Sequence, residues 1–276
     1  MKPGARVSTI IPTYNQEAFI GATIASAVAQ LGDFDHEIVI SSDGSTDRTR
    51  DIVDQWRRRH PGLIRDVGED SNVGLSGNFR RLLTSATGDY IAILEGDDLW
   101  VSPDKLARQF DFLRKNEDCS MVFSQITVRQ YPAGTDSFLP RQTGLTKNKL
   151  DGADFLAEPT MNLIANMSSC FLGGDIARSL PERMFQGRFN EIALAFHYEQ
   201  RGKIGFIAEP MSIYHQHSGG VWTGSSREEQ LRSGLETRRM VLDVADPKYH
   251  REIHAIMEEK YLAPLAQLAQ SHEVPS

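Results

Sequence analysis

The sequence lacks the features that mark several large classes of protein. Only two of its 276 residues are cysteines, Cys119 and Cys170, and their spacing suits neither a metal site nor a disulfide framework. No apolar run reaches the ~18 residues needed to cross a bilayer, and no secretory segment precedes the first strand-like run. We therefore expect a cytoplasmic protein, with docking at the inner face of a membrane left open.

An excess of basic residues is also missing. Lys and Arg total 30 against 37 Asp and Glu, which gives a formal net charge of −7. Proteins that bind the nucleic-acid backbone carry a basic surface, so we expect no nucleic-acid partner. Neither a GxGxxG fingerprint nor a GxxxxGK[ST] loop is present. A bound diphosphate would therefore have to be neutralised by a metal and by side chains.

The first half of the chain alternates strand and helix patterns. Short apolar runs rich in β-branched residues alternate with segments whose apolar residues have helical spacing. These runs lie at residues 7–12, 37–41, 63–67, 90–94 and 121–128. The order predicts an α/β fold with a mostly parallel, Rossmann-like central sheet flanked by helices. Ligands of such sheets bind beyond the carboxyl ends of the strands, so the turns there should converge.

The second half is less regular. Residues 131–148 are polar, contain Pro and Gly, and are predicted to form a loop. A helix is expected at residues 190–201, and strands are expected at 167–172, 204–208 and 212–217. From Arg227 onward the apolar spacing predicts two helices that break near Pro247.

Three carboxylates follow the fourth predicted strand, on Glu95, Asp97 and Asp98. Carboxylates this close repel one another unless a cation lies between them, and Mg²⁺ or Mn²⁺ is usually held by one or two carboxylates together with substrate phosphates. The alternative is an acidic loop that caps the next helix, but Ser102 or Asp104 already suits that role. The turn therefore favours metal binding.

A second acidic turn follows the second predicted strand. Gly44 permits a tight turn there, and Ser45 can cap the next helix. Asp43 would then face the same region and accept hydrogen bonds from a base or a ribose. An Asp-Gly turn by itself is weak evidence for such a role.

Together these turns resemble the inverting family 2 glycosyltransferases of the GT-A fold. The resemblance is carried by VSTIIPTYN (7–15), EIVISSDGSTDRT (37–49), Asn72-Val73-Gly74 with Asn78, and GDYIAILEGDDLW (88–100), and it continues loosely to about Thr223. It implies a hexosyltransferase-type enzyme that moves a sugar from a nucleotide-diphospho-sugar, UDP- or dTDP-linked, to an acceptor hydroxyl with inversion. It also implies Mn²⁺ or Mg²⁺ as cofactor and a role in polysaccharide or glycoconjugate synthesis, with a glycan, lipid-linked or small-molecule acceptor.

The resemblance carries roles over to individual positions. It assigns the metal to Asp98, and two family acids are replaced, one by Ser42 and one by Glu95. The donor-binding positions that it implies are Pro12, Thr13, Tyr14, Glu17, Asp43, Asn72, Asn78 and Asp97.

The family's catalytic base is usually an Asp at a helix start, about eleven residues before a Gly-Lys-Ile segment. Here the segment is at residues 202–204, and the count falls on Glu191. Asp175 and Glu199 are the alternatives. A Glu at a helix start can also simply favour the helix dipole.

Residues 214–217 and 219–222 resemble the family's Tyr-Arg-x-His and Gly-Gly-x-Trp segments, which gives His217 a role at the metal or diphosphate. His215 and His217 point the same way on a strand, so a zinc pair is an alternative. Gly219-Gly220 suggests a loop that closes over the donor.

The resemblance also divides the chain. We expect a GT-A domain at residues 1–225, with a nucleotide-sugar half at about 1–130 and an acceptor half at about 131–225. Residues 226–276 form a helical extension that packs on this domain, with a homodimer and membrane contact as alternatives. Two other functions stay open: a catalytically silent nucleotide-sugar-binding protein, and a sugar-1-phosphate nucleotidyltransferase, which would need a glycine-rich loop where this chain has VSTIIPTYN.

Overall fold

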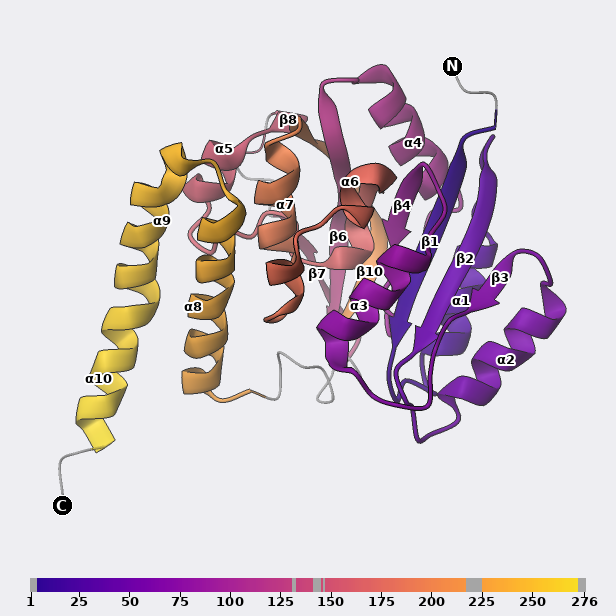
Figure 1. Cartoon of the computed structure of the whole chain (residues 1–276), viewed down its shortest axis with the longest axis horizontal. Helices are drawn as coiled ribbons and strands as arrows, with labels where there is room; N and C mark the ends of the chain where they lie inside the picture. The colour runs from indigo at the N-terminus through magenta and orange to yellow at the C-terminus, as the bar shows by residue number, and fades with distance from the viewer. Residues whose placement is uncertain (1–3, 131–132, 141–144, 146, 217–224, 273–276) are drawn as a thin grey trace.

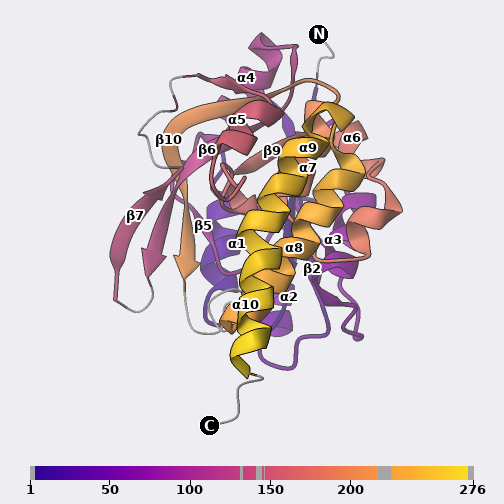
Figure 2. The same ribbon diagram turned by 90° about the vertical axis from the view of Figure 1, so that its left-hand side faces the viewer.

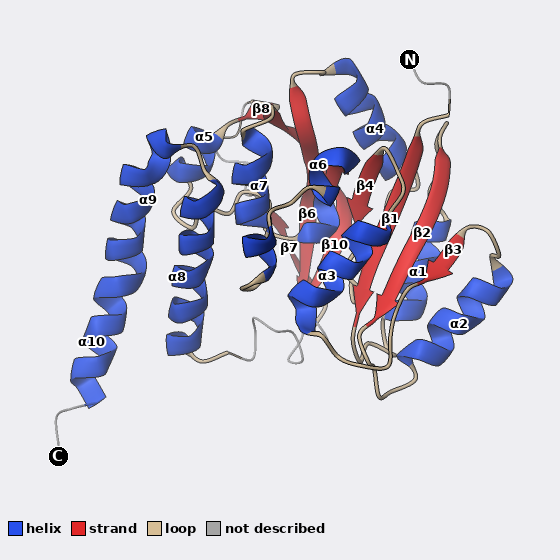
Figure 3. Ribbon diagram, viewed as in Figure 1, coloured by secondary structure: helices blue, strands red, loops and turns tan. Residues whose placement is uncertain are grey.

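A mixed sheet of ten strands forms the centre of the computed structural model, with helices on both faces (Figure 1, Figure 3). The structure describes residues 4–130, 133–140, 145, 147–216 and 225–272. The strands are β1 (Arg6–Thr13), β2 (Asp35–Ser42), β3 (Ile64–Asp66), β4 (Tyr90–Ile93), β5 (Leu99–Trp100), β6 (Cys119–Gln130), β7 (Thr135–Leu139), β8 (Lys149–Leu150), β9 (Cys170–Gly173) and β10 (Lys203–Gln216). The α-helices are α1 (Ile20–Val28), α2 (Thr49–Arg59), α3 (Gly74–Ser85), α4 (Lys105–Lys115), α5 (Gly152–Ala157), α6 (Gly174–Arg178), α7 (Glu191–Glu199), α8 (Arg227–Val244), α9 (His250–Met257) and α10 (Ala263–His272).

The parallel half of the sheet has the order β3-β2-β1-β4, as the alternating pattern predicts. Ile10 pairs with Val39 and Ile93 and faces the core that contains α3. The next residue, Ile11, pairs with Ile40 and faces the core that contains α1 and α2. Both faces are therefore apolar and covered, which is why these strands read as continuous hydrophobic runs.

The other half of the sheet contains antiparallel strands, whereas the sequence predicted a mostly parallel sheet; β9 itself overlaps the strand predicted at residues 167–172. β9 lies between β4 and β6 and is antiparallel to both. β10 is one strand with an irregular register between Ile207 and Ser212, where we predicted two strands. Pro210 lies at this irregularity, as expected for a residue that cannot donate to a ladder. β7 pairs only with β6, within a segment predicted as a loop, and its residues are mostly exposed, so it lacks the pattern of a buried strand.

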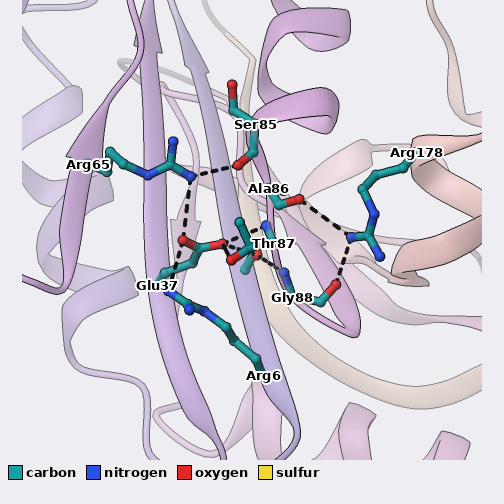
Figure 4. A network of polar contacts seen from close by, with 9 residues as sticks. Arg6, Glu37, Arg65, Ser85, Ala86, Thr87, Gly88 and Arg178 are labelled. Carbon is teal, nitrogen blue, oxygen red and sulfur yellow. Dashed lines mark hydrogen bonds and ion pairs between the residues drawn. The ribbon is translucent and has the colours of Figure 1, made fainter.

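A buried carboxylate fastens the edge of the parallel half at which β1 and β2 begin (Figure 4). Glu37 is 4 % exposed and accepts hydrogen bonds from the Ser8 hydroxyl at 2.6 Å and from the Thr87 amide and hydroxyl at 2.8 and 2.7 Å. Arg6 and Arg65 form ion pairs with it at 3.1 and 3.5 Å. Burial alone would raise the pKa of Glu37, but these partners lower it below its ordinary value. The opposite edge, where β1, β2 and β4 end, carries the polar turns.

α8 packs beside α7, and α10 runs alongside α8 on the side away from α7 (Figure 1, Figure 2). Ser226 and Glu229 form a reciprocal capping box at the start of α8. A short helical turn at Pro247–Tyr249 separates α8 from α9, so the predicted break near Pro247 is confirmed. Within the described residues, no helix combines the length and the apolar character that a membrane crossing requires.

Candidate functional site

Gly96 brings the acidic turn after β4 against the end of β1. Its amide donates to the Pro12 carbonyl at 3.1 Å, and its carbonyl accepts from the Thr23 hydroxyl at 3.0 Å. A Cβ at this position would lie 2.8 Å from the Thr13 side chain and would collide with the Gln16 carboxamide oxygen. Only glycine permits this approach, which joins the turns after the first and fourth predicted strands.

Asp98 lies at the centre of the turn and is fully buried. Its Oδ2 accepts hydrogen bonds from Asn166 Nδ2 at 2.9 Å and from the Ser168 hydroxyl at 2.6 Å, and its Oδ1 accepts from the His215 amide at 3.2 Å. Burial and the neighbouring Asp97 raise the pKa of Asp98 well above its ordinary value, although these donors act against the rise. Asp97, in contrast, is only partly buried.

Asn166 holds two of the acids together. Its Nδ2 also donates to Glu95 Oε2 at 2.8 Å, while its Oδ1 accepts from the Ser168 amide at 2.7 Å. The Ser168 hydroxyl in turn accepts from the Glu95 amide at 2.9 Å. The sequence reading missed Asn166 and Ser168. The one local signal for them is a helix-capping pattern, because Asn166 caps the short turn before β9.

Glu191 is the first residue of α7, so the prediction that it lies at the start of a helix is confirmed. Asn190 caps this helix by accepting from the Ala193 amide at 2.9 Å. The side-chain Nδ2 of Asn162 donates to Glu191 Oε1 at 2.7 Å, so the carboxylate is held by a loop that precedes β9.

Glu191 also belongs to the same electrostatic cluster as the acidic turn. The pKa of Glu95 is raised well above its ordinary value by burial and then by Asp98, Asp97 and Glu191. Burial and the same four carboxylates raise the pKa of Tyr214 on β10. A general base and a diphosphate-binding turn would need this proximity.

The two alternative bases lie elsewhere. Asp175 lies in the first turn of α6, near the start of β4, because the Gly174 amide donates to the Asp89 carbonyl. Glu199 ends α7, about 12 Å along the helix from Glu191, and accepts from the Tyr249 hydroxyl at 3.0 Å. Neither residue adjoins the acidic turn.

The donor-binding residues predicted near the ends of β1 and β2 fall into two groups. Asp43 is 3 % exposed, and its Oδ1 accepts from the Val73 amide at 3.0 Å and lies 3.6 Å from Arg81. Its own amide donates to the Thr13 carbonyl, while Tyr14 beside it is 48 % exposed. Pro12, Thr13, Tyr14 and Asp43 therefore lie together at this edge.

The remaining predicted positions have local partners. Glu17 accepts from the Arg48 amide at 2.9 Å, at the start of α2. Asn72 accepts from the Gly74 amide at 2.9 Å. The side-chain Nδ2 of Asn78 donates to the Ser41 carbonyl at 3.0 Å, and the Oδ1 of Asn78 is buried without a partner among the described residues.

One local prediction about this edge is wrong. The helix after β2 begins at Thr49, so Ser45 does not cap it. The Asp47 carboxylate accepts from the Thr49 amide instead, and the Ser45 hydroxyl accepts from the Asn15 amide. The consequence is that Ser45 links the turns after β1 and β2.

The metal prediction can be compared with the described residues only in part, because His217 and residues 219–222 lie outside them. Within the described chain, no three His, Cys, Asp or Glu side chains converge to hold a metal. His215 turns its Nδ1 to the Asp97 carbonyl at 2.7 Å. Carboxylate oxygens are the ligands that Mg²⁺ and Mn²⁺ prefer, and such ions are usually completed by phosphate and water. The acidic turn therefore offers the type of ligand that such an ion prefers, and the assignment of the metal to Asp98 and His217 stays a prediction.

Comparison with known proteins gives a family and a fold. The family model described as glycosyl transferase family 2 matches residues 8–169. An uncharacterised protein of Mycobacterium tuberculosis (strain H37Rv) is 28 % identical over 261 residues, which cover 92 % of this chain and 72 % of that protein.

Two solved structures are similar in fold. The mannosyltransferase PcManGT from Pyrobaculum calidifontis, in complex with GDP-Man and Mn²⁺, has a TM-score of 0.67 and 18 % identity, and the match covers all of this chain and 77 % of that one. TarS residues 1–349 from S. aureus, in complex with UDP-GlcNAc, has a TM-score of 0.65 and 16 % identity, with 93 % and 71 % covered. At these identities the likeness concerns the fold alone.

Proposed function

Because this chain belongs to glycosyl transferase family 2, we propose that it transfers the sugar of a nucleotide-diphospho-sugar to an acceptor hydroxyl with inversion. One observation carries the proposal. The carboxylates of Glu95, Asp97 and Asp98 share one electrostatic cluster with Glu191, at the edge where β1, β2 and β4 end. This gathers the groups for a metal-bound diphosphate and for a general base. Polysaccharide or glycoconjugate synthesis is the proposed setting.

The donor's base is proposed to lie between Tyr14 and Asp43. Asp43 is a buried acceptor whose carboxylate is oriented by the Val73 amide and Arg81. Uracil and thymine both present an N–H that can donate to this carboxylate, so the site is compatible with the UDP- or dTDP-sugar that the family resemblance implies. Tyr14 offers an exposed aromatic ring beside this acceptor.

The diphosphate is proposed to lie over the acidic turn with Mn²⁺ or Mg²⁺, held by Asp97, Asp98 and His217. Asp98 has donors on both carboxylate oxygens and is fully buried. Because each carboxylate oxygen can accept more than once, we propose that Asp97 presents the more accessible oxygen to the ion, while Asp98 fixes the turn and offers the ion a remaining lone pair. When bound, the ion offsets the charge that develops on the departing nucleoside diphosphate. Arg188, which lies close enough to Glu95 to lower the pKa of that carboxyl, is proposed to add positive charge beside the diphosphate.

Glu191 is proposed to take the proton from the acceptor hydroxyl. The acceptor oxygen forms its bond to the anomeric carbon from the opposite face, the bond from that carbon to the diphosphate oxygen breaks, and its electron pair leaves with the nucleoside diphosphate. The hydrogen bond from Asn162 holds the Oε1 atom of Glu191 in place and so orients the whole carboxylate. We propose that Oε2, the other oxygen, accepts the proton.

A two-stage experiment tests this function. UDP-, dTDP- and GDP-sugars are screened by thermal shift with Mn²⁺ or Mg²⁺, because a ligand that binds the native state raises its stability. Release of nucleoside diphosphate is then measured with and without acceptors. Acceptor-dependent release supports a transferase. Donor binding without any release would identify a silent binder and contradict the proposal.

A further inference from the structure

Arg238 is a buried cation in the middle of α8. It is 4 % exposed, its Nη2 donates to the Thr160 carbonyl, and its Nη1 donates to the Gly234 carbonyl at 3.3 Å. The guanidinium lies over the ring of Tyr261, 4.8 Å from the centroid. Nε is buried without a partner among the described residues, and no carboxylate there forms an ion pair with this side chain.

A buried guanidinium without a carboxylate partner is destabilising, so packing alone does not account for it. Burial lowers the pKa of Arg238, and the groups that oppose this are Tyr261 and Glu191. The Glu191 carboxylate is therefore the acid whose attraction reaches Arg238, although the two side chains form no direct bond.

A single loop, residues 160–166, connects the two. Thr160 is held by Arg238, and Asn162 donates to Glu191 while accepting from the Ala165 amide at 2.8 Å. The loop ends at Asn166, which bridges Glu95 and Asp98 as described above. Met161 and Ala165 have φ angles of 54° and 66°, which non-glycine residues rarely adopt. Such a conformation persists only where the surroundings impose it.

We propose that Arg238 is a positioning residue for Glu191: from α8 it holds the 160–166 loop, and the loop orients the carboxylate that removes the acceptor proton. This inference rests on the function proposed above. It makes the C-terminal extension a part of the site's support, because the contact that fixes Thr160 comes from α8.

The test compares Arg238→Met with Arg239→Met, the same change at the adjacent, exposed position of α8. Arg238→Met is expected to lower kcat ~10- to 100-fold, since small misplacements of catalytic groups have effects of this size. KM for the donor should change less than kcat, because Arg238 contacts the loop at Thr160 and not at Asn166, where the loop meets the acidic turn. Arg239→Met should leave both constants unchanged. Arg238→Lys keeps the charge and should recover part of the loss.

A double-mutant cycle and hydrogen exchange complete the test. In an Asn162→Ala background, Arg238→Met should lower kcat little further, because both changes break the same chain of contacts from Arg238 through the 160–166 loop to Glu191. Amide exchange of residues 158–166 should be faster in Arg238→Met and in Arg238→Lys, but not in Arg239→Met. Additive losses of kcat, or an unchanged kcat in folded Arg238→Met, would overturn the inference, as would unchanged exchange. If the native protein transfers no sugar, the proposed function fails, while the exchange data still decide whether Arg238 holds the loop.

Discussion

Replacing Asn166 with Ala removes the side chain that joins the acidic turn to β9. Three hydrogen bonds are lost: Nδ2 to Glu95 Oε2 at 2.8 Å, Nδ2 to Asp98 Oδ2 at 2.9 Å, and the Ser168 amide to Oδ1 at 2.7 Å. Hydrogen bonds to charged groups are each worth about 1.5–3 kcal/mol, and a cap about 0.5–2 kcal/mol. The raised pKa values of Glu95 and Asp98 favour their neutral forms, whose hydrogen bonds are weaker, so we expect a loss of about 3 kcal/mol in the free energy of unfolding.

Urea unfolding without divalent ions measures this loss. The midpoint should fall while the slope of free energy against urea stays constant, because the surface exposed on unfolding does not change. Asn162→Ala is a matched control, since it removes an amide from the same loop that contacts one acid rather than two. A loss below about 1 kcal/mol for Asn166→Ala would refute the view that Asn166 holds the turn together.

Three further predictions concern buried ionisable groups. Asp98 has a raised pKa in the folded protein. In the metal-free state its contribution to stability therefore falls as pH rises from its unfolded pKa, about 4, through its folded pKa. Asp98→Asn should flatten this decline in urea titrations, and a decline of unchanged size would contradict the raised pKa of Asp98. Glu37 has a lowered pKa, so its contribution is present above about pH 4.3 and is lost as pH falls through the folded value. Glu37→Gln should remove about 2 kcal/mol at pH 7, measured by the urea midpoint, and little at pH 2; an equal loss at both values would contradict the network in Figure 4. Burial lowers the pKa of Lys105 to about 7, so stability should rise between about pH 7 and 10.5, because over that range the unfolded state holds the proton that the folded state has released. Thermal unfolding of Lys105→Met should lack this rise, and a rise of native size would exclude Lys105 as its source.

The parts of the fold that the sequence predicted are those that local pattern determines. β1, β2 and β4 are short apolar runs buried on both faces, and the polar turns after them follow from the rule that parallel strands end at one edge. The family resemblance rests on these turns, and the family model covers the same region.

The parts that the sequence did not predict depend on contacts between distant residues. Asn166 forms hydrogen bonds with Glu95 and Asp98, which lie 71 and 68 residues away in the sequence. Arg238 donates to Thr160, which lies 78 residues away. Neither residue type carries a local signal for such a partner. β7 was not predicted because it is an exposed strand paired with β6 alone, so its sequence lacks the apolar pattern of a buried face.

The measurement that most directly tests the account is acceptor-dependent release of nucleoside diphosphate by Glu191→Gln. The substitution keeps the shape of the side chain but removes the base, so transfer should fall roughly 10²–10⁴-fold. The donor's dissociation constant, measured by calorimetry with Mn²⁺, should stay near that of the native protein. Glu199→Gln, the same change at the other end of α7, should transfer at the native rate. Native-like transfer by Glu191→Gln would contradict the assignment of the base and with it the proposed geometry of the site.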